Sequence, residues 1–238
     1  MTRVELKKLS KSQLKGNWKT PVLVMLVYTI AVMALSFVSE FSDSMGINLI
    51  STIFVLGLEI WFIVGFANFF LRFSENDGKA KFDDLLVSKK AVLKSLGLFT
   101  LMFVIGIVLG IIIIFATSSM IAYSILSESV STGMIVGVLI FAIVLSIPIV
   151  ILELALAMTP YIFVDKEELG LIDSIKLSIK MMKGNKWNLF VINLSFIGWA
   201  LLCILTLGIG YLWLGPYIQL TITNFYIDLD NNFKEISI

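Results

Sequence analysis

The stretch LGLFTLMFVIGIVLGIIIIFA, residues 96–116, runs for 21 residues without a charged side chain. A helix needs about 20 mostly apolar residues to cross the roughly 30 Å hydrocarbon core of a bilayer. A surface helix of a soluble domain would carry polar residues along one side, and this stretch does not. Residues 96–116 therefore predict a transmembrane helix and an integral membrane protein.

Five further apolar runs lie on either side of this stretch, at 21–38, 47–71, 134–164, 189–207 and 211–227. The composition agrees, because 58% of the chain is hydrophobic and 15% is charged, whereas soluble domains carry about 25% charged residues. We expect an all-α protein, a polytopic transmembrane helical bundle of six spans in one membrane domain over 1–238. Five spans is the alternative if the last run is re-entrant.

All 18 lysines and arginines lie on one set of alternate linkers. They fall within residues 1–20, 72–95 and 165–188, with Lys234 in the tail. The opposite linkers, 39–46 and 117–133, carry only acidic charges. The positive-inside rule predicts that both termini of this multi-pass protein are cytoplasmic. Because the preamble is long and the first run is of full span length, we expect that run to stay as an anchor and not be cleaved.

Two basic stretches, 79–96 and 169–183, place apolar residues near one helical face. Amphipathic helices of this kind lie in the headgroup plane with their lysines toward anionic lipid. The lysines expected at this lipid-facing interface are Lys89, Lys90, Lys94, Lys176, Lys180 and Lys183. Anionic headgroups at the cytoplasmic face are the expected partners. Nucleic acid is not, because the net charge is only +1.

Short strings recur along the chain. LKGNW at 14–18 is similar to MKGNKW at 182–187, and NFFL at 68–71 is similar to NFYI at 224–227. Glycine and asparagine tolerate the left-handed conformation that ends a helix, so the first pair predicts a joint before a span. The strings suggest three parallel units of interfacial helix plus hairpin, at 1–78, 79–166 and 167–238. Chance similarity among apolar strings is the alternative.

Two carboxylates interrupt the apolar runs, Glu59 in the second and Glu153 in the fourth. An ionised side chain inside a bilayer is costly and usually faces a bundle interior or a watery cavity. Both runs cross in the same direction, and the two residues are expected at similar depth. They indicate a proton or cation site or a polar binding cavity. The alternative is a protonated Glu that is hydrogen-bonded to a neighbouring helix.

The sixth run carries a polar stripe of Gly215, Gln219, Thr223 and Tyr226 on one helical face, and Asn193 in the fifth run is expected to meet it. Hydrogen bonding between helices explains such a stripe better than ligand contact. Pro148, five residues before Glu153, removes a backbone hydrogen bond and predicts a kink or hinge. The alternatives for this long run are that it tilts or that it emerges into the interface near Pro160.

The sequence lacks the residues that several classes of enzyme and metal site require. The chain has no histidine and one cysteine, Cys203, so it offers no imidazole base and no internal disulfide. It also has no phosphate-binding loop of the Gly-x-x-x-x-Gly-Lys type. We therefore expect a protein that is not an enzyme and holds no cofactor or metal.

TLGIGYLWLGPY at 206–217, together with KGNW at 15–18 and NFY at 224–226, resembles the membrane family called domain of unknown function 975. The resemblance implies a six-span bacterial cell-membrane protein and supplies no catalytic residue. We expect a non-enzymatic scaffold or accessory subunit that binds lipid, a membrane partner or a second copy, in envelope stress or peptide self-protection. The alternative is a transporter or permease-like component for a small or amphipathic substrate. It requires a midplane cavity lined by Glu59 and Glu153.

Overall fold

A computed structural model describes residues 1–40, 44–126 and 132–236, and these residues contain helices and no strand. The all-α prediction is confirmed. The elements are α1 (Arg3–Leu14), α2 (Lys19–Glu40), α3 (Met45–Glu75), the 3-10 turn η1 (Phe82–Leu85), α4 (Lys89–Leu126), α5 (Thr132–Leu156), α6 (Thr159–Asp165), α7 (Leu171–Met181), α8 (Lys186–Leu194), α9 (Ile197–Leu205) and α10 (Tyr211–Ile236).

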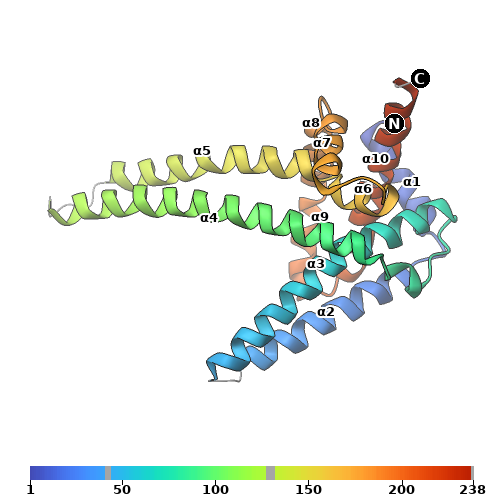
Figure 1. Cartoon of the computed structure of the whole chain (residues 1–238), viewed down its shortest axis with the longest axis horizontal. Coiled ribbons are helices and arrows are strands. Elements are labelled where there is room, and N and C mark those ends of the chain that lie inside the picture. Colours follow the sequence, from blue (N-terminus) through green and yellow to red (C-terminus); the bar gives the residue numbers. More distant parts are fainter. Residues whose placement is uncertain (41–43, 127–131, 237–238) are drawn as a thin grey trace.

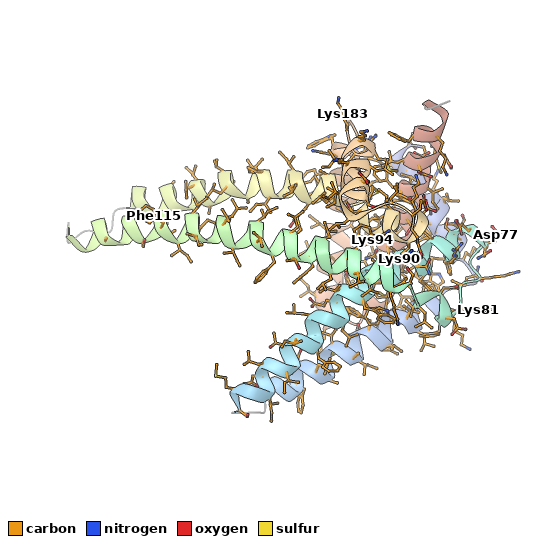
Figure 2. The ribbon with its side chains drawn as sticks, viewed as in Figure 1. Asp77, Lys81, Lys90, Lys94, Phe115 and Lys183 are labelled. Atoms are coloured by element: carbon orange, nitrogen blue, oxygen red, sulfur yellow. The ribbon has the colours of Figure 1, made fainter. Side chains whose placement is uncertain are left out.

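Helices α2 and α3 form one long arm, α4 and α5 form another, and the two arms diverge from a common end (Figure 1). Both chain termini lie at this common end, beside α1, α6 and α7. Lys81, Lys90, Lys94 and Lys183 gather there, whereas Phe115 lies far along α4 (Figure 2). We call this common end, formed by residues 1–20, 72–95 and 165–188, the basic end.

Five segments in the described part of the chain are long and apolar enough to cross a membrane. They are Lys19–Phe37, Met45–Glu75, Lys89–Phe115, Leu139–Asp165 and Lys186–Leu205. These segments bear out the predicted helical membrane bundle. The sixth expected span, 211–227, lies in α10, which is not among them.

Helix α10 is a central helix of the bundle, with Leu220, Thr223 and Tyr226 almost fully buried. Gly215 packs against Met25 of α2, which lies six residues, or about 9 Å, from the start of that helix. The α9–α10 turn at 208–210 is therefore about halfway along α2. In Figure 1 it ends well short of the far ends of both arms. A turn at this depth favours a re-entrant α9–α10 hairpin, in which neither the fifth nor the last apolar run crosses the membrane fully. It differs from the five-span alternative, in which only the last run is re-entrant.

Helix α7 is the amphipathic helix expected within 169–183. The side that packs on the protein carries small residues, Ser174 and Ser178, and Ser178 Oγ donates to the Ala155 carbonyl at 2.8 Å. Ile172 and Ile179 on the opposite side are exposed. Small buried side chains let α7 lie close to α5 and α6, and its isoleucine stripe remains free to contact lipid.

The prediction of a second interfacial helix over 79–96 is wrong. This stretch forms only η1, a short extended link and the first turns of α4. Asn68 Nδ2 donates to the Asp84 carbonyl at 2.8 Å, and Gly65 lies directly against the Leu85 backbone. Ser88 then accepts a hydrogen bond from Ala91 N and starts the helix. These contacts with α3 override the amphipathic pattern.

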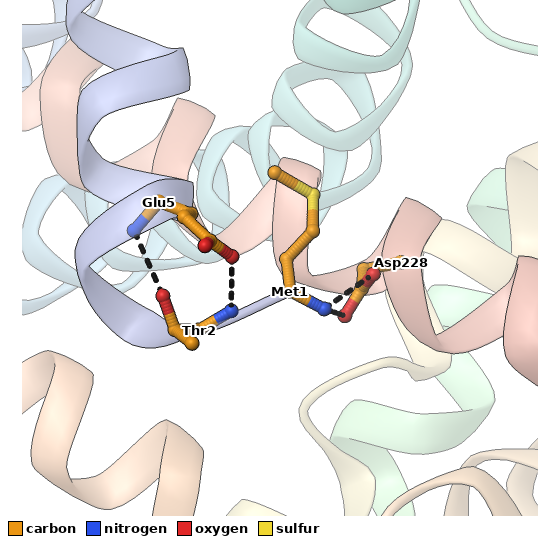
Figure 3. Close-up of polar contacts among 4 residues, drawn as sticks. All are labelled: Met1, Thr2, Glu5 and Asp228. Atoms are coloured by element: carbon orange, nitrogen blue, oxygen red, sulfur yellow. Dashed lines mark hydrogen bonds and ion pairs between the residues drawn. The ribbon is translucent and has the colours of Figure 1, made fainter.

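Helix α1 is attached to α10 along its length. Thr2 and Glu5 form a reciprocal capping box at its N-terminus, and the Met1 amine lies 2.9 Å from both carboxylate oxygens of Asp228 (Figure 3). Deeper in the contact, Asn224 Nδ2 donates to Gln13 Oε1 at 2.8 Å. Ser74 Oγ donates to Asn224 Oδ1 at 2.8 Å. This network joins α1, α3 and α10.

The recurring strings occupy matching local structures. Gly16 and Gly184 both have left-handed backbones, with φ of +85° and +82°. Asn17 and Asn185 each donate from Nδ2 to the carbonyl four residues earlier, at 3.1 Å. The glycine joint that the sequence predicts is therefore present twice.

The expected units also contact one another in a cycle. η1 of the second unit packs on α3 of the first, α7 of the third packs on α6 of the second, and α1 packs on α10. Three equivalent units would produce these three contacts, but the division into units at 78 and 166 stays a prediction.

Candidate functional site

A cavity of about 700 Å³ lies where the two arms meet. Its walls come from α2, α3, α5, α6, α8 and α10, so residues from all three expected units face it. The volume falls within the roughly 300–1,000 Å³ that is typical of small-molecule sites. The fold thus places a ligand-sized space among its membrane-spanning segments.

Glu59 and Glu153 both line this cavity. Glu59 comes from the middle of α3 and is half-buried, whereas Glu153 comes from the end of α5 and is exposed toward the cavity. Neither carboxylate makes a hydrogen bond or ion pair with any residue that the structure describes. A hydrogen bond to either Glu from a neighbouring helix, the alternative interpretation, is not formed among the described residues, and the choice between the two interpretations stays a prediction.

Asn193 of α8 and Gln219 of α10 line the same cavity, so the helices bring these polar residues together with the carboxylates. Thr223 does not line the cavity. It is fully buried, and its Oγ1 donates to the Gln219 carbonyl at 2.8 Å. Thr223 serves the packing of α10, and Gln219 is the member of the polar stripe that faces the cavity.

Aromatic rings make up much of the remaining wall. The aromatic residues that line the cavity are Tyr28, Phe62, Phe66, Tyr161, Phe190 and Tyr211. The face of an aromatic ring attracts cations. No lysine or arginine is among the lining residues. The wall therefore combines two carboxyl groups with aromatic rings, and it contains no lysine or arginine.

Pro148 lies one turn before this wall. Helix α5 continues through Pro148 to Leu156 without interruption. The break in the fourth apolar run comes at residues 157–158, directly before the short helix that holds Pro160. Emergence into the interface near Pro160 and a hinge at Pro148 both remain predictions.

The six lysines predicted to face lipid all lie at the basic end. Lys89, Lys90, Lys176, Lys180 and Lys183 are exposed. Lys94 is partly buried instead, and its Nζ donates to the Glu167 carbonyl at 2.8 Å and lies over the Phe163 ring. Lys94 thus connects α4 to the 165–170 linker.

A second polar cluster lies at the basic end and was not expected from the sequence. Asp230 pairs with Lys166 and with Lys234, the latter at 2.7 Å. Although burial acts to raise the pKa of the Asp230 carboxyl, hydrogen bonds from Lys166 and Lys234 lower it on balance. Tyr226 donates to Asp165 at 2.6 Å alongside. This cluster ties the 165–170 linker to the end of α10.

The aromatic half of the cavity was also missed in the sequence. Tyr28, Tyr161 and Tyr211 carry no distinguishing pattern in a chain with 6 Tyr and 18 Phe. Glu59 and Glu153 could be singled out because a carboxylate is conspicuous inside an apolar run, whereas an aromatic ring there is not. Only the packing of α2, α6 and α10 places these three tyrosines in the wall of the cavity.

Fold and site together define a class: a helical membrane protein whose hairpins enclose a cavity lined by carboxyl groups and aromatic rings. Within its described residues, no cluster of acidic or cysteine side chains is arranged to hold a metal ion. The chain belongs to the family described as "Protein of unknown function (DUF975)", which matches residues 1–232. Neither the curated proteins nor the solved structures contain a match to the chain.

Proposed function

We propose that this protein binds a small cationic amphipathic molecule in the cavity between its arms and acts as a transporter-like component for it. The single observation that carries the proposal is that Glu59 and Glu153, from separate hairpins, line one cavity without a partner group. A midplane cavity with both carboxylates is the feature that separates the transport alternative from a scaffold with a solid core.

The chemistry of the wall selects the ligand class. A carboxylate in a weakly solvated site attracts a cation more strongly than one in water, because the local dielectric is low. Aromatic rings add cation–π attraction and apolar contact area. A ligand with a positive charge and an apolar body would be attracted to both the carboxylates and the aromatic rings. An anionic ligand would gain neither of these two attractions.

The proposal includes an orientation. The sorting of all 18 basic residues to one end supports a cytoplasmic basic end in a bacterial plasma membrane. Both termini lie at this end in Figure 1, and a re-entrant α9–α10 hairpin leaves them on one side. The exposed lysines of α7 would then face the anionic headgroups of the inner leaflet.

A binding experiment in nanodiscs tests the proposal. Tetraphenylphosphonium is the cationic probe, and tetraphenylborate is the anionic counterpart of the same shape. We expect saturable binding of the cation, weakened about tenfold or more by Glu59→Gln and by Glu153→Gln, a loss of about 1.4 kcal/mol each. Glu75→Gln, at an exposed position of the same α3 helix as Glu59, is the matched control and should bind normally.

Unchanged cation affinity in the Glu59→Gln, Glu153→Gln double variant would contradict the proposal, as would wild-type binding equal to empty nanodiscs. Uptake into proteoliposomes then separates transport from binding. Pro148→Ala should slow uptake and leave binding intact if α5 bends there during transport. Equal uptake by both proteins would remove Pro148 as a hinge.

The scaffold function remains a second proposal with weaker support. The apolar arm of α4 and α5 exposes many large side chains, including Phe103, Ile107 and Ile111, but lipid covers such a surface as well as a protein partner does. Purification from native membranes with a constant partner, or as a stable homo-oligomer, would support the scaffold.

A further inference from the structure

A groove separate from the cavity runs along α9 and the start of α10. Two adjoining depressions of about 340 and 300 Å³ share Trp18 and Trp213 as walls. We call their combined surface the tryptophan groove. Its apolar lining is completed by Trp199, Leu202, Leu214, Val22, Leu23 and Leu26.

Positive charge gathers at one end of the tryptophan groove. Lys11 and Lys19 line it. Lys7, one turn before Lys11, is not a wall residue, but its carbonyl accepts a hydrogen bond from the wall residue Tyr217 at 3.4 Å. Its Nζ lies 4.1 Å from the centre of the Phe196 ring and 2.9 Å from Ser195 Oγ. None of these three lysines forms an ion pair with a described residue. Burial and the nearby Lys11 both lower the pKa of Lys7. An anion bound here would relieve the repulsion between the two ammonium groups.

The length of the groove matches one leaflet of a bilayer. It extends from the lysines at the basic end to Thr206 and Gly210 beside the α9–α10 turn. Helix α9, which forms its side, has 9 residues and is about 13 Å long. Half of the roughly 30 Å hydrocarbon core is about 15 Å. A chain that lies in this groove would therefore end near the bilayer midplane.

We propose that the tryptophan groove is a binding site for one anionic phospholipid of the leaflet at the basic end, with its phosphate on Lys7 and Lys11 and an acyl chain along Trp18, Trp199 and Trp213. The groove has lysines at one end and apolar side chains along the rest of its length, as a phospholipid has a charged headgroup and an apolar tail. Trp18, next to Lys19 at the cationic end, suits the membrane interface, where tryptophan is enriched. The site is distinct from the cavity of Glu59 and Glu153 and does not depend on its function.

Native mass spectrometry tests the site. The protein is released from nanodiscs that contain equal amounts of phosphatidylglycerol and phosphatidylcholine. We expect one retained phosphatidylglycerol per chain. Lys11→Gln should reduce its retention about fivefold, as one lysine near anionic lipid contributes. Lys79→Gln changes an exposed lysine at the basic end that lies outside both the groove and the predicted lipid-facing set. It is the matched control and should retain the lipid.

A second variant blocks the groove and keeps every lysine. Leu202→Trp adds a large ring at an exposed groove position of α9, and it should displace the lipid without disturbing the core. Circular dichroism checks that each variant remains folded. Equal retention of both phospholipids by the wild type would overturn the proposal. Equal losses in Lys11→Gln and Lys79→Gln, or unchanged retention in Leu202→Trp, would also overturn it.

Discussion

Gly215 of α10 and Met25 of α2 lie so close that a Cβ atom at position 215 would stand 2.4 Å from Met25 Cε. This contact aligns the first turns of α10 with the half of α2 near the basic end. Tyr211, one helical turn before Gly215, then lines the same cavity as Tyr28 and Glu59. The contact between Gly215 and Met25 places the α9–α10 turn about halfway along α2.

The depth of this turn is the first prediction. A nitroxide on Ile209→Cys, in a Cys203→Ser background, should show the high oxygen and low nickel-chelate accessibility of a bilayer interior. Met45→Cys, at the exposed start of α3, should show the reverse and serves as the control. Electron paramagnetic resonance in nanodiscs measures both. Equal surface-like values at the two positions would mean that 211–227 crosses fully and that the chain has six spans.

The Asn224 network gives the second prediction. Asn224→Ala should lower the free energy of unfolding by about 1–3 kcal/mol, because buried hydrogen-bonding groups of Gln13 and Ser74 lose their partner. Thermal unfolding in detergent measures the change. Asn231→Ala, on the exposed side of the same helix, should change stability little. Similar effects at both positions would show that the network does not hold α1, α3 and α10 together.

Asp230 gives the third prediction. Because its pKa is lowered from the ordinary value of 3.8 in the folded protein, its ion pairs stabilise the fold fully above that value. The stabilisation is lost as the pH falls through the lowered pKa. Asp230→Asn should cost about 2 kcal/mol near neutral pH, as expected for hydrogen bonds to a charged group. The difference from wild type should disappear at strongly acidic pH.

Unfolding curves across the acidic range measure this dependence. Glu75→Gln is the control, since Glu75 pairs with Arg72 and both side chains are about half exposed. Exposed pairs contribute little, about 0–1 kcal/mol. A constant stability deficit of Asp230→Asn down to the lowest pH would refute the ion-pair explanation and indicate a packing defect.

The fourth prediction concerns two glycines of α3. A Cβ at Gly65 would stand 2.9 Å from the Leu85 carbonyl oxygen, whereas nothing lies within 4 Å of a Cβ at Gly57. Gly65→Ala should destabilise the protein by about 1–3 kcal/mol, because a backbone contact must shift. Gly57→Ala should be neutral or stabilise by up to about 1 kcal/mol, through helix propensity. Equal changes in the thermal unfolding temperature of Gly65→Ala and Gly57→Ala would show that η1 is not held on α3 by the contact at Gly65.

Several parts of the fold could be predicted because they depend on local quantities. The apolar length of 96–116 and the one-sided placement of the lysines reflect transfer free energies that add up residue by residue. Gly16 and Gly184 could be recognised because only a backbone free of a Cβ easily adopts positive φ. The interfacial helix expected at 79–96 does not form, because contacts with Asn68 and Gly65 hold η1 on α3. The spacing of apolar residues in the sequence cannot predict such a tertiary contact.

From the amino-acid sequence alone it follows that the bilayer is the solvent of this chain, that its lysines and arginines lie at one end, and that Glu59 and Glu153 are exceptional inside apolar runs. Only the tertiary structure decided that these two carboxylates share a cavity with Asn193 and Gln219, and that Thr223 does not. The reason is physical. Burial in lipid is a property of each segment, whereas a cavity exists only where the packing of several helices leaves one.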